Sequence, residues 1–107
     1  MTDEPNVQYL GFWTNALERE YAFAVREPSS EPLQYTLTIA NEAFVAHRAR
    51  YQDAAEICSM RLHRELKAHS NRPPTHRFCV TDAELADYQD KHRVKVVHKL
   101  SKVSRQD

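Results

Sequence analysis

EREYAFAVREPSSEPLQYTLTIA, residues 18–40, is the stretch that decides the fold of this chain. Aromatic, aliphatic and β-branched residues recur at every second position on both sides of the central EPSSEP, namely Tyr21, Phe23 and Val25 before it and Leu33, Tyr35, Leu37 and Ile39 after it. This period of two predicts β-strands. Because prolines and serines between two such runs are typical of a turn, the stretch predicts an antiparallel hairpin with one buried face.

A helical pattern follows the hairpin. Apolar residues recur at three- and four-residue steps along a stripe of Tyr51, Ala55, Cys58, Leu62 and Leu66 that continues from Phe44. Asn41 suits a helix N-cap, and Asp53 in QDAAE suits a second one. The pattern therefore fits either one helix over residues 42–69 or two helices with a break near residues 50–53, ending before Pro73.

The region after Pro74 predicts a third strand and a last helix. HRFCV, residues 76–80, has the composition of a short strand. TDAE follows at once, and Thr81 and Glu84 have the spacing of a capping box. The helical pattern continues through Leu85 and Tyr88 and decays after His92.

The N-terminal region is predicted to be irregular over about the first dozen residues, with apolar anchors at Leu10, Phe12, Trp13 and Leu17. The secondary structure of YLGFWTNALERE, residues 9–20, is ambiguous, and a short helix over residues 14–19 would have Thr14 as its cap. The order is thus β-β-α-β-α, a two-layer α+β fold in which an antiparallel hairpin and a third strand carry helices on one face. We expect one small globular domain over residues 1–107, poorly ordered at 1–8 and 102–107.

The composition excludes several kinds of site. Gly11 is the single glycine of 107 residues, so no glycine-rich phosphate loop, dinucleotide fingerprint or G-x-S-x-G elbow can form. The chain is 41% hydrophobic, and no apolar run approaches the ~20 residues of a membrane span. Because the first residues are acidic and polar rather than signal-like, a cytoplasmic location without membrane contact is expected.

The cysteines and histidines do not predict a catalytic or metal site. Cys58 and Cys79 are expected to be free, buried thiols in a reducing compartment. His76 and Cys79 have the spacing of half a zinc site, but on a strand this spacing points their side chains to opposite faces. We therefore predict no catalytic residue, no cofactor and no metal ligand.

Two polar groups remain as candidates. Arg50, Gln52 and Asp53 interrupt the apolar stripe and form, with His47, a possible functional cluster near a helix junction. The second group is a basic tail that could contact an acidic partner, formed by Lys91, Arg93, Lys95, Lys99, Lys102 and Arg105.

The charge distribution favours a protein partner. Net charge is zero, but six acids and two bases in residues 1–33 contrast with two acids and six bases in residues 88–107. A small sheet also leaves edges that a second copy can cover. These features predict a small non-catalytic protein-interaction or regulatory domain that forms a homodimer.

Two alternative functions stay open. One is a weak nucleic-acid-associated accessory protein using the basic tail, although a neutral chain and a tail without aromatic residues do not favour it. The other is an enzyme whose site is assembled at a dimer interface from His47, Arg50 or Asp53.

Overall fold

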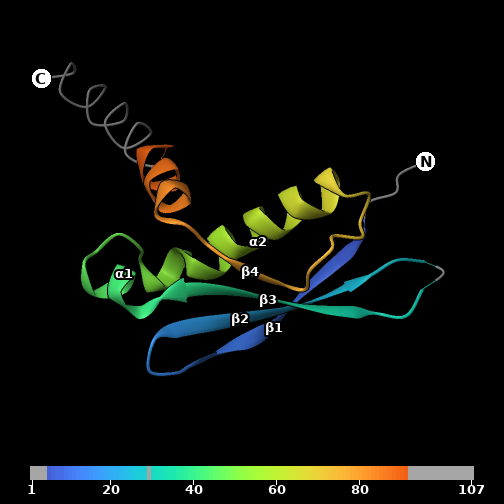
Figure 1. The fold of residues 1–107 in the computed structure, drawn as a ribbon, viewed down its shortest axis with the longest axis horizontal. Helices are drawn as coiled ribbons and strands as arrows, with labels where there is room; N and C mark the ends of the chain where they lie inside the picture. The colour runs from blue at the N-terminus through green and yellow to red at the C-terminus, as the bar shows by residue number, and fades with distance from the viewer. Residues whose placement is uncertain (1–4, 29, 92–107) are drawn as a thin grey trace, which may run out of the picture.

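The computed structural model describes residues 5–28 and 30–91, which form a four-stranded sheet with helices on one face (Figure 1). The strands are β1 (Asn6–Thr14), β2 (Glu18–Arg26), β3 (Leu33–Ala40) and β4 (Arg77–Cys79), and the first helices are α1 (Asn41–Val45) and α2 (Tyr51–Ala68). A C-terminal helix covers residues 82–91. The strands lie in the order β1-β2-β3-β4, antiparallel except that β4 is parallel to β3. The predicted α+β class is confirmed.

The hairpin of β2 and β3 forms as predicted. Tyr21 pairs with Leu37 and Phe23 pairs with Tyr35, so the alternating apolar residues of the two strands share one face. All four side chains are buried. The local period of two decides which face of each strand is buried, because slipping by one residue would move every apolar side chain to the other face.

The prediction of an irregular N-terminal region is wrong, because the structure has the strand β1 there. Residues 6–14 pair with β2 and are not irregular, and the expected poor order over residues 1–8 does not extend to residues 6–8. The ambiguity over residues 14–19 is resolved against a helix, since β1 ends at Thr14 and β2 begins at Glu18. Instead the Asn15 side chain accepts hydrogen bonds from the backbone N–H groups of Leu17 and Glu18, at 2.8 and 2.9 Å, and closes a turn between the strands.

The helical region is divided into two helices, which resolves the alternative left open by its pattern. The chain turns at residues 46–50, where His47 has a positive φ of 63°. The helices begin after Ala40 and Arg50, so the caps predicted at Asn41 and Asp53 are wrong. The Asn41 side chain instead donates a hydrogen bond to the backbone carbonyl of Asn15, at 2.8 Å, and ties α1 to the β1–β2 turn.

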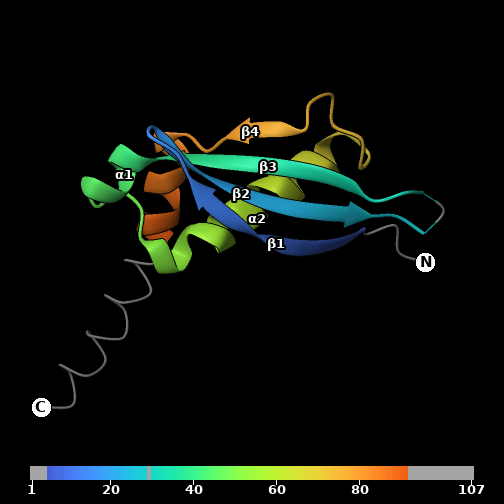
Figure 2. The ribbon, with the colours of Figure 1, turned by 90° about the horizontal axis from the view of Figure 1, so that it is seen from below.

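The core lies between the sheet and α2, which crosses the strands on one face. Seen from below, the strands lie in front of α2 and their near face carries no helix of the described residues (Figure 2). The buried residues of α2 are Ala54, Ile57, Cys58, Leu62 and Leu66. Tyr51, also predicted on this stripe, is the first residue of α2 and is exposed.

The C-terminal helix docks as its sequence predicts. Thr81 and Glu84 form the expected capping box: the Thr81 N–H donates to the Glu84 carboxylate at 3.0 Å, and the Glu84 N–H donates to the Thr81 hydroxyl at 3.2 Å. Leu85 and Tyr88 of this helix are buried in the core. Among the described residues, no helix has the length and hydrophobicity needed to cross a bilayer.

Candidate functional site

Large apolar side chains gather at the outer edge of the sheet, on β1. This strand lies at one end of the strand order, so only its β2 side is paired within the described chain. We call Tyr9, Leu10, Phe12 and Trp13, which are each between 43% and 49% exposed, the β1 strip. Three of these residues were predicted as anchors. They are only half covered because β1 lies at the edge of the sheet, where the described residues supply no outer neighbour.

The β1 strip extends over both faces of the sheet. Tyr9 and Phe12 pair with buried aromatic residues of β2 and so lie on the face that carries the helices. Trp13 pairs with Glu20 and lies on the face without helices. A strand that paired with β1 would therefore meet apolar side chains both above and below its own backbone.

The edge of β1 has little protection against pairing. Natural edge strands are commonly blocked by charged side chains, prolines or bulges. Residues 6–14 contain no charged residue and no proline. A bulge is present between Tyr9 and Gly11, but it interrupts the strand at one point and leaves regular segments on both sides.

An arginine fixes the part of the β1 strip on the helix face. The Cζ atom of Arg19 lies 4.2 Å from the ring centre of Phe12 and 4.4 Å from that of Tyr51. Tyr51 in turn stacks on the buried ring of Phe44, with ring centres 4.5 Å apart. Cation–π contacts at exposed sites contribute about 0.5–1 kcal/mol each. Phe12 is therefore held in place although half of its surface is exposed.

A belt of polar side chains fixes Trp13 on the other face. The indole Nε1–H donates to a carboxylate oxygen of Glu20 at 2.9 Å. Arg77 on β4 donates to Glu18 at 2.6 Å and to Glu20 at 3.4 Å, on β2. To make these contacts its side chain passes over β3, which accounts for the burial of Thr38 on a face without helices. The side chains of Trp13, Glu20, Glu18 and Arg77 are thus joined across this face.

The predicted polar cluster lies around the start of α2. His47, Arg50 and Gln52 are exposed, and Asp53 is half-buried in the first helical turn. In the part of the chain that the structure describes, no hydrogen bond or ion pair joins the side chains of these four residues. Their functional role stays a prediction.

Arg48 beside this cluster joins three elements, a role that was not predicted. Its guanidinium forms an ion pair with Glu42 of α1 and lies 3.3 Å from Asp82 of the C-terminal helix. This guanidinium lowers the pKa of the Glu42 carboxyl. Gln89 donates a hydrogen bond to the backbone carbonyl of His47 at 3.2 Å. Local sequence patterns gave no signal for Arg48, because Asp82 is 34 residues away along the chain.

One residue of the predicted basic tail lies in the described part of the chain. The Lys91 ammonium lies 3.3 Å from the carboxylate of Asp87, one helical turn earlier. Exposed pairs of this kind contribute about 0.3–0.5 kcal/mol. The other five, Arg93, Lys95, Lys99, Lys102 and Arg105, lie outside the described residues.

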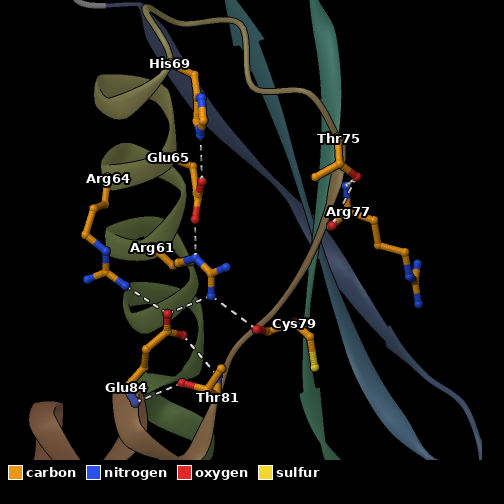
Figure 3. A network of polar contacts seen from close by, with 9 residues as sticks. All are labelled: Arg61, Arg64, Glu65, His69, Thr75, Arg77, Cys79, Thr81 and Glu84. Carbon is orange, nitrogen blue, oxygen red and sulfur yellow. Dashed lines mark hydrogen bonds and ion pairs between the residues drawn. The ribbon is translucent and has the colours of Figure 1, made fainter.

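A cleft of about 200 Å³ between α2 and the C-terminal helix is a weaker candidate, because its charged groups already have partners. Arg61 donates to the carboxylate of Glu84 at 2.6 Å and to the backbone carbonyl of Cys79 at 3.2 Å (Figure 3). Arg64 donates to the same oxygen of Glu84 at 2.8 Å. Because Glu84 also caps its own helix, this network joins α2, β4 and the C-terminal helix.

The two cysteines differ in environment, and both are free. Cys58 is buried as predicted, and burial raises the pKa of its thiol to about 12, with the Glu84 carboxylate as a lesser cause. Cys79 is exposed, and its predicted burial is wrong, because it pairs with Thr38 on the face without helices. Among the described residues, no group of three or more His, Cys, Asp and Glu side chains could hold a metal ion.

The sequence contains a signal that could have predicted β1: its alternating residues shift by one position partway along the strand. Val7 and Tyr9 alternate, and the pattern resumes one position late at Phe12 and Thr14, with Gly11 between them. A lone glycine inside an alternating stretch is typical of a bulge. Comparisons with family models, curated proteins and solved structures found no match, so the function of this surface is inferred from its own chemistry.

Proposed function

We propose that this chain is a small non-catalytic protein-interaction domain that self-associates into a homodimer through the β1 strip. The observation that supports this most strongly is the exposure of four large side chains on both faces of β1, an uncharged edge strand whose outer side has no partner strand among the described residues. Monomeric proteins rarely leave large contiguous apolar patches exposed. The outer side of an edge strand also presents a row of free backbone N–H and C=O groups to a partner.

Burial of the β1 strip supplies the driving force. Complete burial of a large apolar side chain stabilises a protein by about 1.5–3 kcal/mol. Because each member of the strip is already about half buried, docking adds on the order of 1 kcal/mol per side chain. A two-fold interface uses the same patch twice. Little side-chain entropy is lost at Phe12 and Trp13, since the free chain already holds both in place.

The polar features of the described residues support a non-catalytic role. The thiol of Cys58 is buried and its pKa is raised, so it is a poor nucleophile. The charged groups in the cleft beside α2 are paired, with Arg61 and Arg64 both bound to Glu84. This network is explained by its structural role, which is to hold α2, β4 and the C-terminal helix together, and it requires no substrate.

We place the domain in the cytoplasm. Cys58 and Cys79 are both free, and reducing compartments keep thiols in this state. In an oxidising compartment the exposed thiol of Cys79 would be open to disulfide formation with other thiols.

Light scattering on the full chain tests the proposal, with Leu10→Lys as the disrupting variant. Leu10 lies at the bulge of β1, and a lysine there would bring two positive charges together in the dimer. We expect the unmodified chain to have the mass of a dimer at micromolar concentration and Leu10→Lys to have that of a monomer. The matched control is Leu17→Lys, the same change at a residue that is 80% exposed and outside the strip, which should remain dimeric. A monomeric unmodified chain would contradict the proposal.

A further inference from the structure

We infer that the two copies join by antiparallel pairing of β1 with β1, in a register that places Tyr9 of each copy opposite Phe12 of the other. The two sheets then form one continuous sheet, with the helices of both copies on the same face. This inference rests on the proposed function and gives the interface its geometry. It follows from the position of the bulge in β1.

The bulge sets which residues of β1 share a face. Tyr9 pairs with Phe23 and Phe12 pairs with Tyr21, and the two partners lie two residues apart on the regular strand β2. Tyr9 and Phe12 therefore lie on the same face, although three positions separate them in β1. By the same pairing the helix face receives Val7, Tyr9, Phe12 and Thr14.

Only some registers of β1 against β1 respect these faces. Residues opposite each other in an antiparallel pair point to the same side of the sheet. Tyr9 opposite Phe12 meets this condition and also brings Val7 opposite Thr14. A shift by one residue would place Tyr9 opposite Trp13, which lies on the other face, and would break the match along the whole strand.

The bulges distinguish the remaining registers. With Tyr9 opposite Phe12, the bulge at Leu10 and Gly11 in one copy lies opposite the same bulge in the other. The ladder is then interrupted at one place, on the two-fold axis. A shift by two residues keeps the faces matched, but each bulge would lie opposite regular strand and would interrupt the ladder at two places.

A second copy fits this edge better than an unrelated strand. The partner must offer apolar side chains on both faces, and β1 itself has this pattern. The pairing brings Tyr9 and Phe12 together twice, and aromatic residues are favourable cross-strand partners. Because residues 6–14 carry no charge, two copies meet without like-charge repulsion.

Disulfide trapping tests the register. The substitutions Val7→Cys and Thr14→Cys are combined in a Cys79→Ser background, which removes the exposed native thiol. Opposed residues in a sheet have Cα atoms about 4.5–5.5 Å apart, within disulfide range. Under mild oxidation we expect the double variant to shift from the monomer band to a dimer band on a non-reducing gel. The two single variants serve as controls and should stay monomeric on the gel.

The outcomes separate this inference from the proposed function. A chain that scatters light as a dimer but gives no cross-link in the double variant overturns the register and leaves self-association intact. Single variants that cross-link as readily as the double variant also overturn the register. A monomer by light scattering overturns both. If the cysteine variants fail to fold, hydrogen exchange on the unmodified chain decides: amides at residues 7–9 and 12–14 should be protected relative to Leu10→Lys, and equal exchange would refute the pairing.

Discussion

The guanidinium of Arg77 lies 2.6 Å from the carboxylate of Glu18, although their strands, β4 and β2, are not neighbours in the sheet. The arginine passes over β3 and also reaches Glu20, which accepts a hydrogen bond from Trp13 of β1. Side chains on the face without helices thereby connect the first strand of the sheet to the last.

The belt predicts a salt-dependent contribution of Arg77 to stability. Arg77→Met keeps the aliphatic cover over β3 but removes the ion pairs with Glu18 and Glu20. Since exposed pairs contribute about 0.2–1 kcal/mol each, we expect the free energy of unfolding in urea to fall by about 1 kcal/mol. The loss should shrink at high salt. Arg26→Met, at an exposed arginine of β2, is the matched control, and an equal loss there would argue against the belt.

We expect substitution of tyrosine by phenylalanine to have different effects on stability at Tyr35 and at Tyr88. The Tyr35 hydroxyl is fully buried and has no hydrogen-bond partner within the described residues. The Tyr88 hydroxyl donates to the Glu56 carboxylate at 3.0 Å. We expect Tyr35→Phe to leave the free energy of unfolding unchanged or to raise it by up to about 1 kcal/mol, and Tyr88→Phe to lower it by about 1 kcal/mol. A clear loss of stability in Tyr35→Phe would show that its hydroxyl is satisfied.

The thiol of Cys58 predicts a loss of stability in alkaline solution. Burial raises its pKa from an ordinary value of 9.0 to about 12. Because the unfolded chain loses this proton at a lower pH than the folded chain, the contribution of Cys58 is fully present below about pH 9 and is lost as the pH rises towards 12. Urea unfolding across this range should show a steeper decline for the unmodified chain than for Cys58→Ala. The same decline in both would assign the effect to other groups.

Thiol labelling gives an independent check on Cys58 and Cys79. Near neutral pH a disulfide reagent should modify one thiol of the folded chain rapidly, since Cys79 is exposed and Cys58 is buried. In Cys79→Ser the fast phase should disappear until denaturant is added. A rapid reaction of Cys58 in the folded chain would contradict its burial.

The backbone at Gly11 predicts that the bulge depends on glycine. Gly11 has a φ of 133°, a conformation that residues with a side chain rarely adopt. An added Cβ would have no atom within 4 Å, so the cost of Gly11→Ala comes from the backbone and is of order 1–3 kcal/mol. We expect this loss in urea unfolding, together with weaker self-association by light scattering. Leu10→Ala, at the neighbouring residue, should leave the backbone unstrained; unchanged stability in Gly11→Ala would mean that the bulge tolerates a side chain.

The hairpin and the start of the C-terminal helix could be predicted because the residues that specify each of them are close together in the sequence. The alternation around Phe23 and Tyr35 gave the hairpin, and the spacing of Thr81 and Glu84 gave the capping box. The strand β1 was missed because the bulge shifts its alternation by one position, so no single period of two runs through it. Arg48 was missed because two of its partners, Asp82 and Gln89, come from a helix far along the chain.

The sequence by itself determined the hairpin, the apolar stripe of α2 and the start of the C-terminal helix, since each depends on residues within a few positions of one another. The tertiary structure decided which apolar side chains are buried. Leu37 and Leu10 are chemically the same, yet Leu37 is buried on β3 beneath α2 and Leu10 is half exposed on β1. Burial depends on the neighbours that strand order and helix crossing bring together, and β1 lies at the edge of the sheet, where the described residues supply a neighbouring strand on one side only.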